Sequence, residues 1–353
     1  MQTPQRKGMS DTELPVIALT TGDPAGIGPE IVASALAREA LHAVCRPLVI
    51  GNMAVLEGAS RAMGVANHWR RVGSVEEAQF EAGVPDVLDP GGADLSGLTI
   101  GVVQAEAGRA SARYIETAIE LAMAGRVAAV ATAPINKLSL RAGGIPYLDH
   151  TAMFMKLTDS PHAMTMFVLD GLRIFFATRH LSLAGAIKQL SAGLICEALE
   201  HANEALQSYG IERPRIAVAA LNPHAGEGGL FGAEEEREIG PGIAAALKQG
   251  IDAFGPMGAD SVFHLVRSRG IADAVLSLYH DQGHIAAKSM DFERTVAVTT
   301  GLPFVRASVD HGTAFDIAGT GTASHVSMAE CVRIAARYAM LLRAGRASSK
   351  GAS

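Results

Sequence analysis

Apolar and polar residues along the chain form two recurring patterns. Short, nearly continuous apolar runs, such as PVIALTT at 15–21 and ADAVLSLY at 272–279, are typical of strands buried on both faces. Longer segments with apolar residues three or four positions apart, such as 28–39, are typical of amphipathic helices. Because the two patterns alternate along the first part of the chain, they predict a parallel sheet covered by helices.

The middle of the chain has a different arrangement. Segment 163–180 contains two apolar runs joined by Asp170-Gly171, which predicts a β-hairpin and therefore antiparallel pairing. We expect further strands at RPLVIG (46–51), LTIGVV (98–103), VAAVATA (127–133) and RIAVAALNP (215–223). We expect further helices at 52–64, 110–124, 191–210, 232–250 and 324–345.

No internal repeat or low-complexity linker divides the 353 residues, so we expect two α/β subdomains that are interleaved in sequence. They would form a single catalytic unit over 15–344, with a disordered lead-in at 1–14 and a frayed tail at 345–353. The expected fold class is therefore α/β, with a mixed, largely parallel sheet.

Composition and charge narrow the classes of partner. The formal net charge is −6 without a cluster of lysine and arginine, so we expect neither nucleic acid nor a membrane surface as partner. The first residues lack the apolar core of a signal peptide, and no apolar stretch is long enough to span a bilayer. The cysteines are isolated at 45, 196 and 331, which favours a reducing, cytoplasmic location.

Candidate chemistry gathers where predicted strands end. Three buried-type strands are followed closely by histidine, at His180, His224 and His280. In open α/β sheets ligands collect beyond the carboxyl ends of strands, and three neutral imidazoles can hold a metal ion with open positions. Any one of these histidines is more often an ordinary core or surface residue, so the argument rests on the repeated placement.

Glycine-rich loops lie beside these candidates. The segment 220–236 places His224 among four glycines and ends in three glutamates, which we expect in the first turn of a helix. TTGDPAGIGPEI at 20–31 is a strand-to-helix turn without the GxGxxG dinucleotide fingerprint. A second such turn at 308–321 carries acidic residues that could hydrogen-bond a ribose or an adenine amine.

Several motifs together resemble those of the 4-hydroxythreonine-4-phosphate dehydrogenase family of pyridoxal phosphate synthesis. They are GDPAGIGPE, TAPINK, His150-Thr151, NPHAGEGG, YHDQG and GLPFVRASVDHGTAFDIAG. The first and last of these are also similar to elements of isopropylmalate and isocitrate dehydrogenases. The resemblance implies an isopropylmalate dehydrogenase-like fold with the active site in a cleft between the subdomains. It further implies NAD- or NADP-dependent oxidation of a hydroxyl beta to a carboxylate, with decarboxylation, by a homodimer that shares its metal sites.

The resemblance also assigns roles to residues. His180, His224 and His280 match the family's ligands for one divalent ion (Zn, Mg, Mn or Co). The residues that match its substrate-binding positions are His150, Thr151, Lys288 and Arg306. The residues in its cofactor-binding region are Asp310, His311, Gly312, Thr313, Asp316 and Gly319. We expect Lys288 to hold a substrate anion or to act as the base, and Asp281 to orient a histidine.

Four positions depart from the family pattern and bear on the substrate. Ala152 stands where the pattern has Glu, Ala297 where it has a substrate-binding Asn, and Arg179 where it has a small polar residue. Arg179 adds a further substrate-binding cation beside His180. His284 after DQG is a feature of the family's paralogues.

The substrate therefore stays open between three acids. They are 4-phosphohydroxythreonine, a four-carbon sugar acid 4-phosphate such as threonate or erythronate phosphate, and a terephthalate-type cis-dihydrodiol. Because a carboxylate at position 152 would pair with the ammonium of 4-phosphohydroxythreonine, we expect weak activity on that substrate. Two other classes also stay open: a metal-dependent hydrolase or aldolase with the same histidines, and a ligand-binding paralogue without catalysis.

Overall fold

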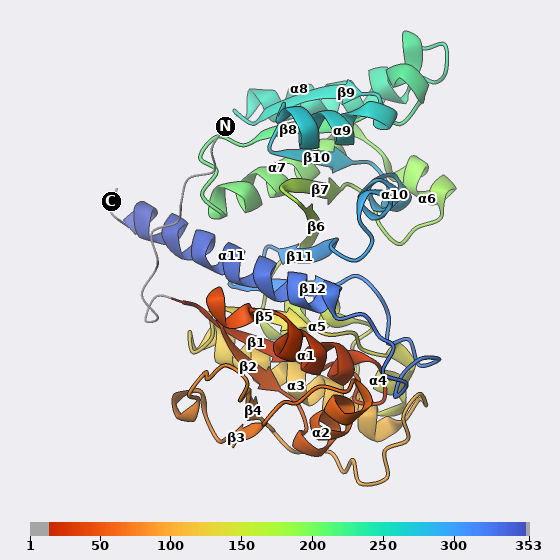
Figure 1. Cartoon of the computed structure of the whole chain (residues 1–353). Helices are drawn as coiled ribbons and strands as arrows, with labels where there is room; N and C mark the ends of the chain where they lie inside the picture. Colours follow the sequence, from red (N-terminus) through yellow and green to blue (C-terminus); the bar gives the residue numbers. More distant parts are fainter. Residues whose placement is uncertain (1–13, 351–353) are drawn as a thin grey trace. The chain divides into compact units, whose positions relative to one another are not determined.

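The computed structural model describes residues 14–350 of the chain, without the side chains of residues 347–350 (Figure 1). The chain divides into two compact units. Unit 1 is built from Met1–Asp149 and His311–Met340, and unit 2 from His150–Asp310 and Leu341–Ser353. Each unit is thus assembled from two separate stretches of sequence. The expected disordered lead-in at 1–14 lies, apart from Leu14, outside the described residues.

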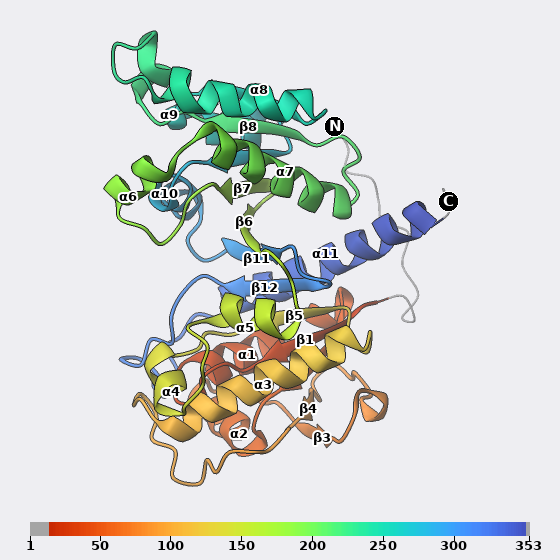
Figure 2. The same ribbon diagram turned by 180° about the vertical axis from the view of Figure 1, so that it is seen from behind.

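Unit 1 contains a parallel set of strands. Its strands in spatial order are β3 (Arg70–Val72), β4 (Asp86–Leu88), β2 (Arg46–Ile50), β1 (Val16–Thr20) and β5 (Ala129–Thr132). Its helices include α1 (Gly28–Arg38), α2 (Met53–Ala62), α3 (Ala105–Met123) and α4 (Lys137–Ala142). In Figure 1 α1 lies in front of these strands, and in Figure 2 α3 lies in front of them, so helices cover both faces.

The glycine-rich turn after β1 is shaped by close backbone packing. A Cβ atom on Gly28 would lie 2.1 Å from the carbonyl oxygen of Thr21. Gly22 has a φ of +67°, and a Cβ there would lie 2.1 Å from the carbonyl oxygen of Pro134. Only glycine fits both positions, which explains why the strand can turn so sharply into α1.

Unit 2 has mixed pairing. Its strands in spatial order are β12 (Val305–Val309), β11 (Val296–Thr300), β6 (Met164–Leu169), β7 (Leu172–Phe176), β10 (Ala274–Ser277), β8 (Arg215–Ala219) and β9 (Asp252–Met257). Pairing is antiparallel from β12 to β7 and parallel from β7 to β9. The predicted hairpin is confirmed, and its turn residues Asp170 and Gly171 both have positive φ, as a two-residue turn requires.

Helices pack on both faces of the unit 2 strands. They include α5 (His150–Leu157), α6 (Leu183–Gln189), α7 (Ala192–Ser208), α8 (Gly240–Lys248), α9 (Ala259–Arg269) and α10 (His280–Met290). Figure 1 shows α9 in front of the strands, and Figure 2 shows α7 and α8 there. Alternate residues of β7 (Leu172, Ile174, Phe176) join a buried cluster with Val262 and Phe263 of α9 and Ala287 of α10. This cluster seats α10 on the sheet.

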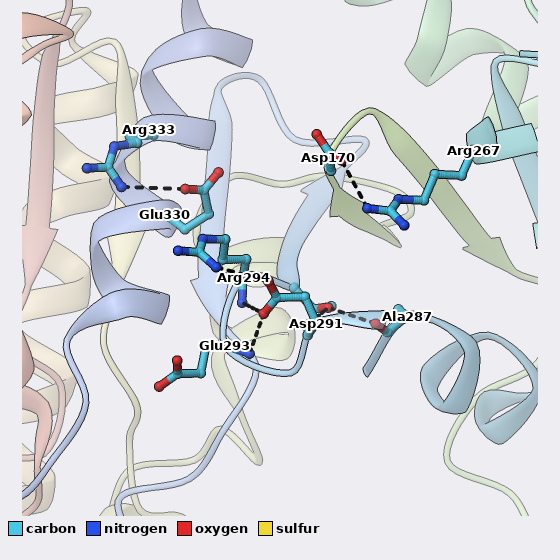
Figure 3. A network of polar contacts seen from close by, with 9 residues as sticks. Asp170, Arg267, Ala287, Asp291, Glu293, Arg294, Glu330 and Arg333 are labelled. Carbon is cyan, nitrogen blue, oxygen red and sulfur yellow. Dashed lines mark hydrogen bonds and ion pairs between the residues drawn. The ribbon is translucent and has the colours of Figure 1, made fainter. Parts of the chain in front are cut away.

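Polar contacts in unit 2 hold the end of α10 and the turn of the β6–β7 hairpin. Asp291 accepts hydrogen bonds from the backbone of Glu293 and Arg294 (3.1 and 3.0 Å), directly after α10 (Figure 3). The side chain of Arg267 on α9 donates to Asp170 in the hairpin turn at 3.0 Å. These contacts close the end of α10 and attach the hairpin to α9.

Two predictions of local structure are wrong, and one predicted helix is confirmed with an irregular first turn. LTIGVV (98–103) forms turns instead of a strand, with Gly101 at a φ of +77° and the side chain of Ile100 exposed. The helix predicted at 232–250 begins as a π-helical segment, η5 (Glu235–Ile239), before α8. The last helix, α11, runs from Val326 to Lys350, so part of the tail expected to be frayed is helical.

Candidate metal and substrate site

Two of the three strand-end histidines lie together in unit 2. β7 and β10 are parallel neighbours, so their carboxyl ends lie at the same edge of the sheet. His180 follows β7 and His280 begins α10 directly after β10, and their ring centroids are 5.7 Å apart. They line a cavity of about 240 Å³ with Thr178, Arg179, Leu181, Leu183, Ala186, Tyr279 and Asp281. Their placement at the ends of parallel neighbouring strands therefore brings these two histidines together.

The third histidine, His224, does not join this pair to form a complete site. It lies in η4 (Pro223–Glu227) after β8, and its ring centroid is 6.2 Å from that of Phe231. Within residues 14–350, no three His, Cys, Asp or Glu residues are grouped so that they could hold a metal ion. Among the described residues the three histidines thus do not form a single site.

Backbone strain marks two of these histidines. His180 has a φ of 51° and His224 a φ of 52°, in the left-handed region that residues with a side chain seldom occupy. Ala225 and Glu227 beside His224 also have positive φ. Such conformations cost on the order of 1–3 kcal/mol each and concentrate at functional sites. The surrounding fold thus imposes these backbone positions against local preference.

The loop that carries His224 is held by glutamates whose role the sequence did not reveal. Glu235 is buried, and its Oε1 accepts hydrogen bonds from the backbone of Leu221 and Asn222 at 2.9 and 2.7 Å. The Asn222 side chain donates to Glu234 and Glu235 at 2.7 and 2.8 Å. These carboxylates were expected in the first turn of a helix. Instead, two of them fix the loop.

The DQG motif after His280 has a structural explanation. Asp281 Oδ1 lies 2.6 Å from Nδ1 of His280, which leaves Nε2 of His280 as the ring atom that could bind a ligand. The buried side chain of Gln282 accepts a hydrogen bond from Leu278 and donates one to the carbonyl of Ala220, both at 2.7 Å. Gln282 thereby ties the end of β10 to the end of β8. The structure contains the contact between Asp281 and His280 that an orienting role requires. The role itself stays a prediction.

His284 is enclosed by aromatic rings. Its ring stacks on that of His280 with centroids 3.6 Å apart and an interplanar angle of 12°. Phe167 and Phe176 lie at centroid distances of 4.2 and 4.8 Å. Burial lowers the pKa of His284 to about 4, so the ring is neutral at pH 7.

Lys288, expected to bind an anion, forms an ion pair within unit 2. Its Nζ lies 2.6 Å from Oδ2 of Asp310 and donates to the Asp310 carbonyl oxygen at 3.2 Å. The ammonium also lies 5.2 Å from the ring centroid of Phe292. Asp310, expected to contact the cofactor, is therefore a direct partner of a residue expected to contact the substrate.

His150 and Arg306 lie in a buried part of unit 2. Arg306 on β12 is 5% exposed, donates to Thr299 at 3.0 Å and places its guanidinium 5.4 Å from the ring centroid of Phe154. Burial, and then the charge of Arg306, hold the pKa of His150 well below its ordinary value of 6.5. His150 can thus offer hydrogen bonds without adding charge. Thr151 follows it in the first turn of α5.

The remaining cofactor candidates lie in unit 1, where the two glycine-rich turns meet. The backbone of Ile27 donates to the carbonyl of Thr313 at 3.0 Å, and the backbone of Gly319 donates to the carboxylate of Glu30. His311 Nε2 lies 2.8 Å from the hydroxyl of Ser327. Gly312 and Asp316 belong to the same loop. Segments nearly 300 residues apart are thus joined, an association that no local pattern could reveal.

Among residues 14–350, no helix is both long and apolar enough to cross a membrane. In the same part of the chain the three cysteines are buried and none of them forms a disulfide.

Comparisons with known proteins agree with the resemblance seen in the motifs. The family model described as "Pyridoxal phosphate biosynthetic protein PdxA" matches residues 43–335. A relative from Halalkalibacterium halodurans named "Putative D-threonate 4-phosphate dehydrogenase" is 52% identical over 325 residues. That match covers 92% of this chain and 97% of the relative.

Solved structures give the same result. A 4-hydroxythreonine-4-phosphate dehydrogenase from Klebsiella pneumoniae is 40% identical with a TM-score of 0.85, over 93% of this chain and 98% of that one. A terephthalate 1,2-cis-dihydrodiol dehydrogenase from Burkholderia xenovorans LB400 is 30% identical with a TM-score of 0.61, over 92% and 98%. The fold and these likenesses define an α/β protein whose named relatives are dehydrogenases. The chain belongs to the PdxA family, as its motifs predicted.

Proposed function

We propose that the chain is a metal- and NAD(P)-dependent dehydrogenase for a four-carbon sugar acid 4-phosphate of the D-threonate type. The hydroxyl beta to the carboxylate loses a proton and its carbon gives a hydride to the nicotinamide. The carboxylate then leaves as carbon dioxide, and the electron pair of the broken bond stays with the α-carbon, which takes up a proton. The observation that carries the proposal is the pair His180 and His280 at parallel strand ends, in a chain 52% identical to a relative with that substrate in its name.

The donor atoms of this pair fit a divalent cation. Asp281 engages Nδ1 of His280, which leaves Nε2 of this imidazole as the possible donor atom, and an imidazole nitrogen suits Zn²⁺ better than Mg²⁺. When bound, the cation supplies Lewis acid chemistry at the substrate hydroxyl and carboxylate. His180, held in a strained backbone conformation, supplies the second imidazole.

A third imidazole is proposed to come from His224 of the partner subunit in a homodimer. Exposed apolar side chains support this, because they lie within seven residues of each of the three histidines in sequence. Leu181 is 42% exposed, Leu230 and Phe231 near His224 are 73% and 49% exposed, and Ile285 on α10 is 63% exposed. Large apolar side chains exposed in this way around a site are typical of an interface.

The cations of unit 2 suit an elongated dianionic substrate. α10 rises about 12 Å over the eight residues from His280 to Lys288, which lie on one face of the helix. An acid whose carboxylate lies near His280 could thus extend its phosphate toward Lys288, with Asp310 as the competing anion in the absence of substrate. Arg179 lines the His180 cavity and adds positive charge there. The buried guanidinium of Arg306 offers a planar fork for a phosphate or a carboxylate.

The neutral groups favour a hydroxylated substrate over an aminated one. Ala152 follows Thr151 in α5, and Ala297 on β11 lies opposite Ser308 and Phe167 in the sheet. Neither methyl group can accept a hydrogen bond from an ammonium group. A missing partner for a buried polar group costs about 1–3 kcal/mol, or about ten- to a hundred-fold in selectivity.

The test is a substrate panel with purified protein, NAD or NADP, and a divalent metal. The panel holds D-threonate and D-erythronate 4-phosphates, 4-phosphohydroxythreonine and the terephthalate cis-dihydrodiol. We expect the highest kcat/KM with a sugar acid 4-phosphate, together with release of carbon dioxide. A higher kcat/KM with 4-phosphohydroxythreonine would restore the biosynthetic substrate, and turnover without nucleotide would indicate a hydrolase or aldolase.

The dihydrodiol remains the second candidate, because a dehydrogenase for terephthalate 1,2-cis-dihydrodiol shares the fold at 30% identity. That identity is well below the 52% of the D-threonate-type relative, which orders the two candidates. Preference for the dihydrodiol in the panel would reverse this order.

A further inference from the structure

His284 occupies a position that none of the roles described so far uses. It lies one helical turn after His280 and one turn before Lys288, on the same face of α10. Its ring lies nearly parallel to that of His280, at a centroid distance of 3.6 Å and an angle of 12°. The stack is therefore a direct contact with the imidazole proposed to bind the metal.

The structure fixes His284 itself on three sides. Phe167 meets it edge-on at 4.2 Å, and Phe176 lies at 4.8 Å. Its Nδ1 lies 2.8 Å from the carbonyl oxygen of His280. Since a carbonyl oxygen only accepts, Nδ1 must carry the proton and donate it. The ring is thus held rigidly in one tautomer by the buried layer beneath it.

The ring of His280 has few other restraints. Its side chain is 37% exposed, and Asp281, which engages Nδ1, is 69% exposed. A contact between such exposed groups contributes little to fixing a ring, because water competes for both partners. The flat contact with a rigid neighbour removes the alternative ring rotations that Asp281 alone would allow.

We infer that His284 is a positioning residue, whose ring holds the imidazole of His280 in the orientation needed to bind the divalent cation. The inference rests on the proposed function. The electrostatics of the stacked pair are favourable. The His280 imidazole gains positive character when it binds a cation, and the π face of the neighbouring His284 ring attracts positive charge. A rigid support also reduces the conformational entropy lost on binding.

Three variants separate the ring contact from the hydrogen bond. His284→Phe keeps a flat ring over His280 and removes the donor to the His280 carbonyl. His284→Asn keeps a short donor and removes the ring, and His284→Leu removes both. Ser289→Ala, at an exposed position on the same helix, is the matched control. Thermal unfolding of the metal-free proteins establishes that each variant folds.

The readout is Zn²⁺ affinity by calorimetry and the visible spectrum of the Co²⁺-loaded protein, with kcat measured as a function of metal concentration. We expect His284→Leu and His284→Asn to lose about ten- to a hundred-fold in Zn²⁺ affinity, the range for groups that support a ligand. His284→Phe and the control should stay within about three-fold of wild type. Saturating metal should return most of kcat to His284→Leu, which a residue acting on the substrate would not show.

Two outcomes would overturn the inference alone: wild-type affinity in His284→Leu, or an equal loss in His284→Phe and His284→Leu. Wild-type protein that binds no divalent metal would overturn the proposed function and, with it, the reason for positioning His280. Wild-type protein that binds metal but oxidises no panel member, with the expected order of variant affinities, would uphold the inference and refute the proposed reaction.

Discussion

Gly283 offers a sharp test of how α10 is seated. A Cβ at this position would lie 2.5 Å from Phe176 Cε1, 2.7 Å from Ser277 Oγ and 2.9 Å from Ile174 Cγ2. All three neighbours are buried in or beside the core cluster, so none can move into solvent to make room. The substitution Gly283→Ala must therefore push α10 away from β7 and β10. Overpacking of this kind costs about 1–3 kcal/mol.

We expect the midpoint of thermal unfolding to fall by about 2–12 °C, since 1 kcal/mol corresponds to about 2–4 °C for a unit of this size. A displaced α10 also moves His280, and a shift of about 1 Å can cost about a hundred-fold in rate. The assays are calorimetric unfolding of the metal-free protein and kcat/KM with the preferred panel substrate. Gly97→Ala is the control, because nothing lies within 4 Å of a Cβ there. If Gly283→Ala matches that control in both assays, the seating of α10 through this contact is refuted.

Two further predictions concern the dimer and the pH dependence of stability. Because His180 and His280 pair within one chain, a mixture of His180→Ala and His224→Ala proteins should regain about a quarter of the activity on subunit exchange, whereas His180→Ala mixed with His280→Ala should not. Activity in neither mixture, or full activity of a monomer in sedimentation, would contradict the shared site. His150 is held neutral in the folded state by burial and Arg306, so its contribution to stability is complete above pH 6.5 and is lost as the pH falls below it. With metal chelated, the free energy of unfolding of His150→Asn should change less between pH 8 and 5 than that of wild type. The difference between the two slopes should be at most about 1.4 kcal/mol per pH unit. Parallel pH profiles for the two proteins would refute the assignment.

The predictions from sequence succeeded where the signal was local. The apolar runs at β1 and β10 and the hairpin turn at Asp170-Gly171 each depend on a few adjacent residues, and the structure has all three. LTIGVV failed because an apolar run alone does not supply a neighbouring strand, and Gly101 turns the chain out of the extended conformation.

The site was predictable in part for the same reason. Strand-end placement identified His180 and His280, but the sequence does not state that β7 and β10 are neighbours, since about 100 residues separate them. Their parallel pairing decides that these two histidines meet. The supporting role of Glu235 was not predictable, because the hydrogen bonds that it accepts from Leu221 and Asn222 reach back 14 and 13 residues to a loop of irregular backbone.

α10 shows why the candidate site is easier to recognise in the structure than in the sequence pattern. Its buried face is made by Gln282, Gly283 and Ala287, a polar residue, a residue without a side chain and a methyl group, so it lacks the apolar stripe that predicts an amphipathic helix. His280, His284 and Lys288 repeat every four residues along a neighbouring face. Gln282 can be buried because both ends of its amide are hydrogen-bonded, and Gly283 lets the helix approach the sheet closely. The helix thus packs on the sheet through polar contacts and small residues instead of large hydrophobic side chains. For this reason a change of one methyl group on its buried face should disturb the groups on the neighbouring face.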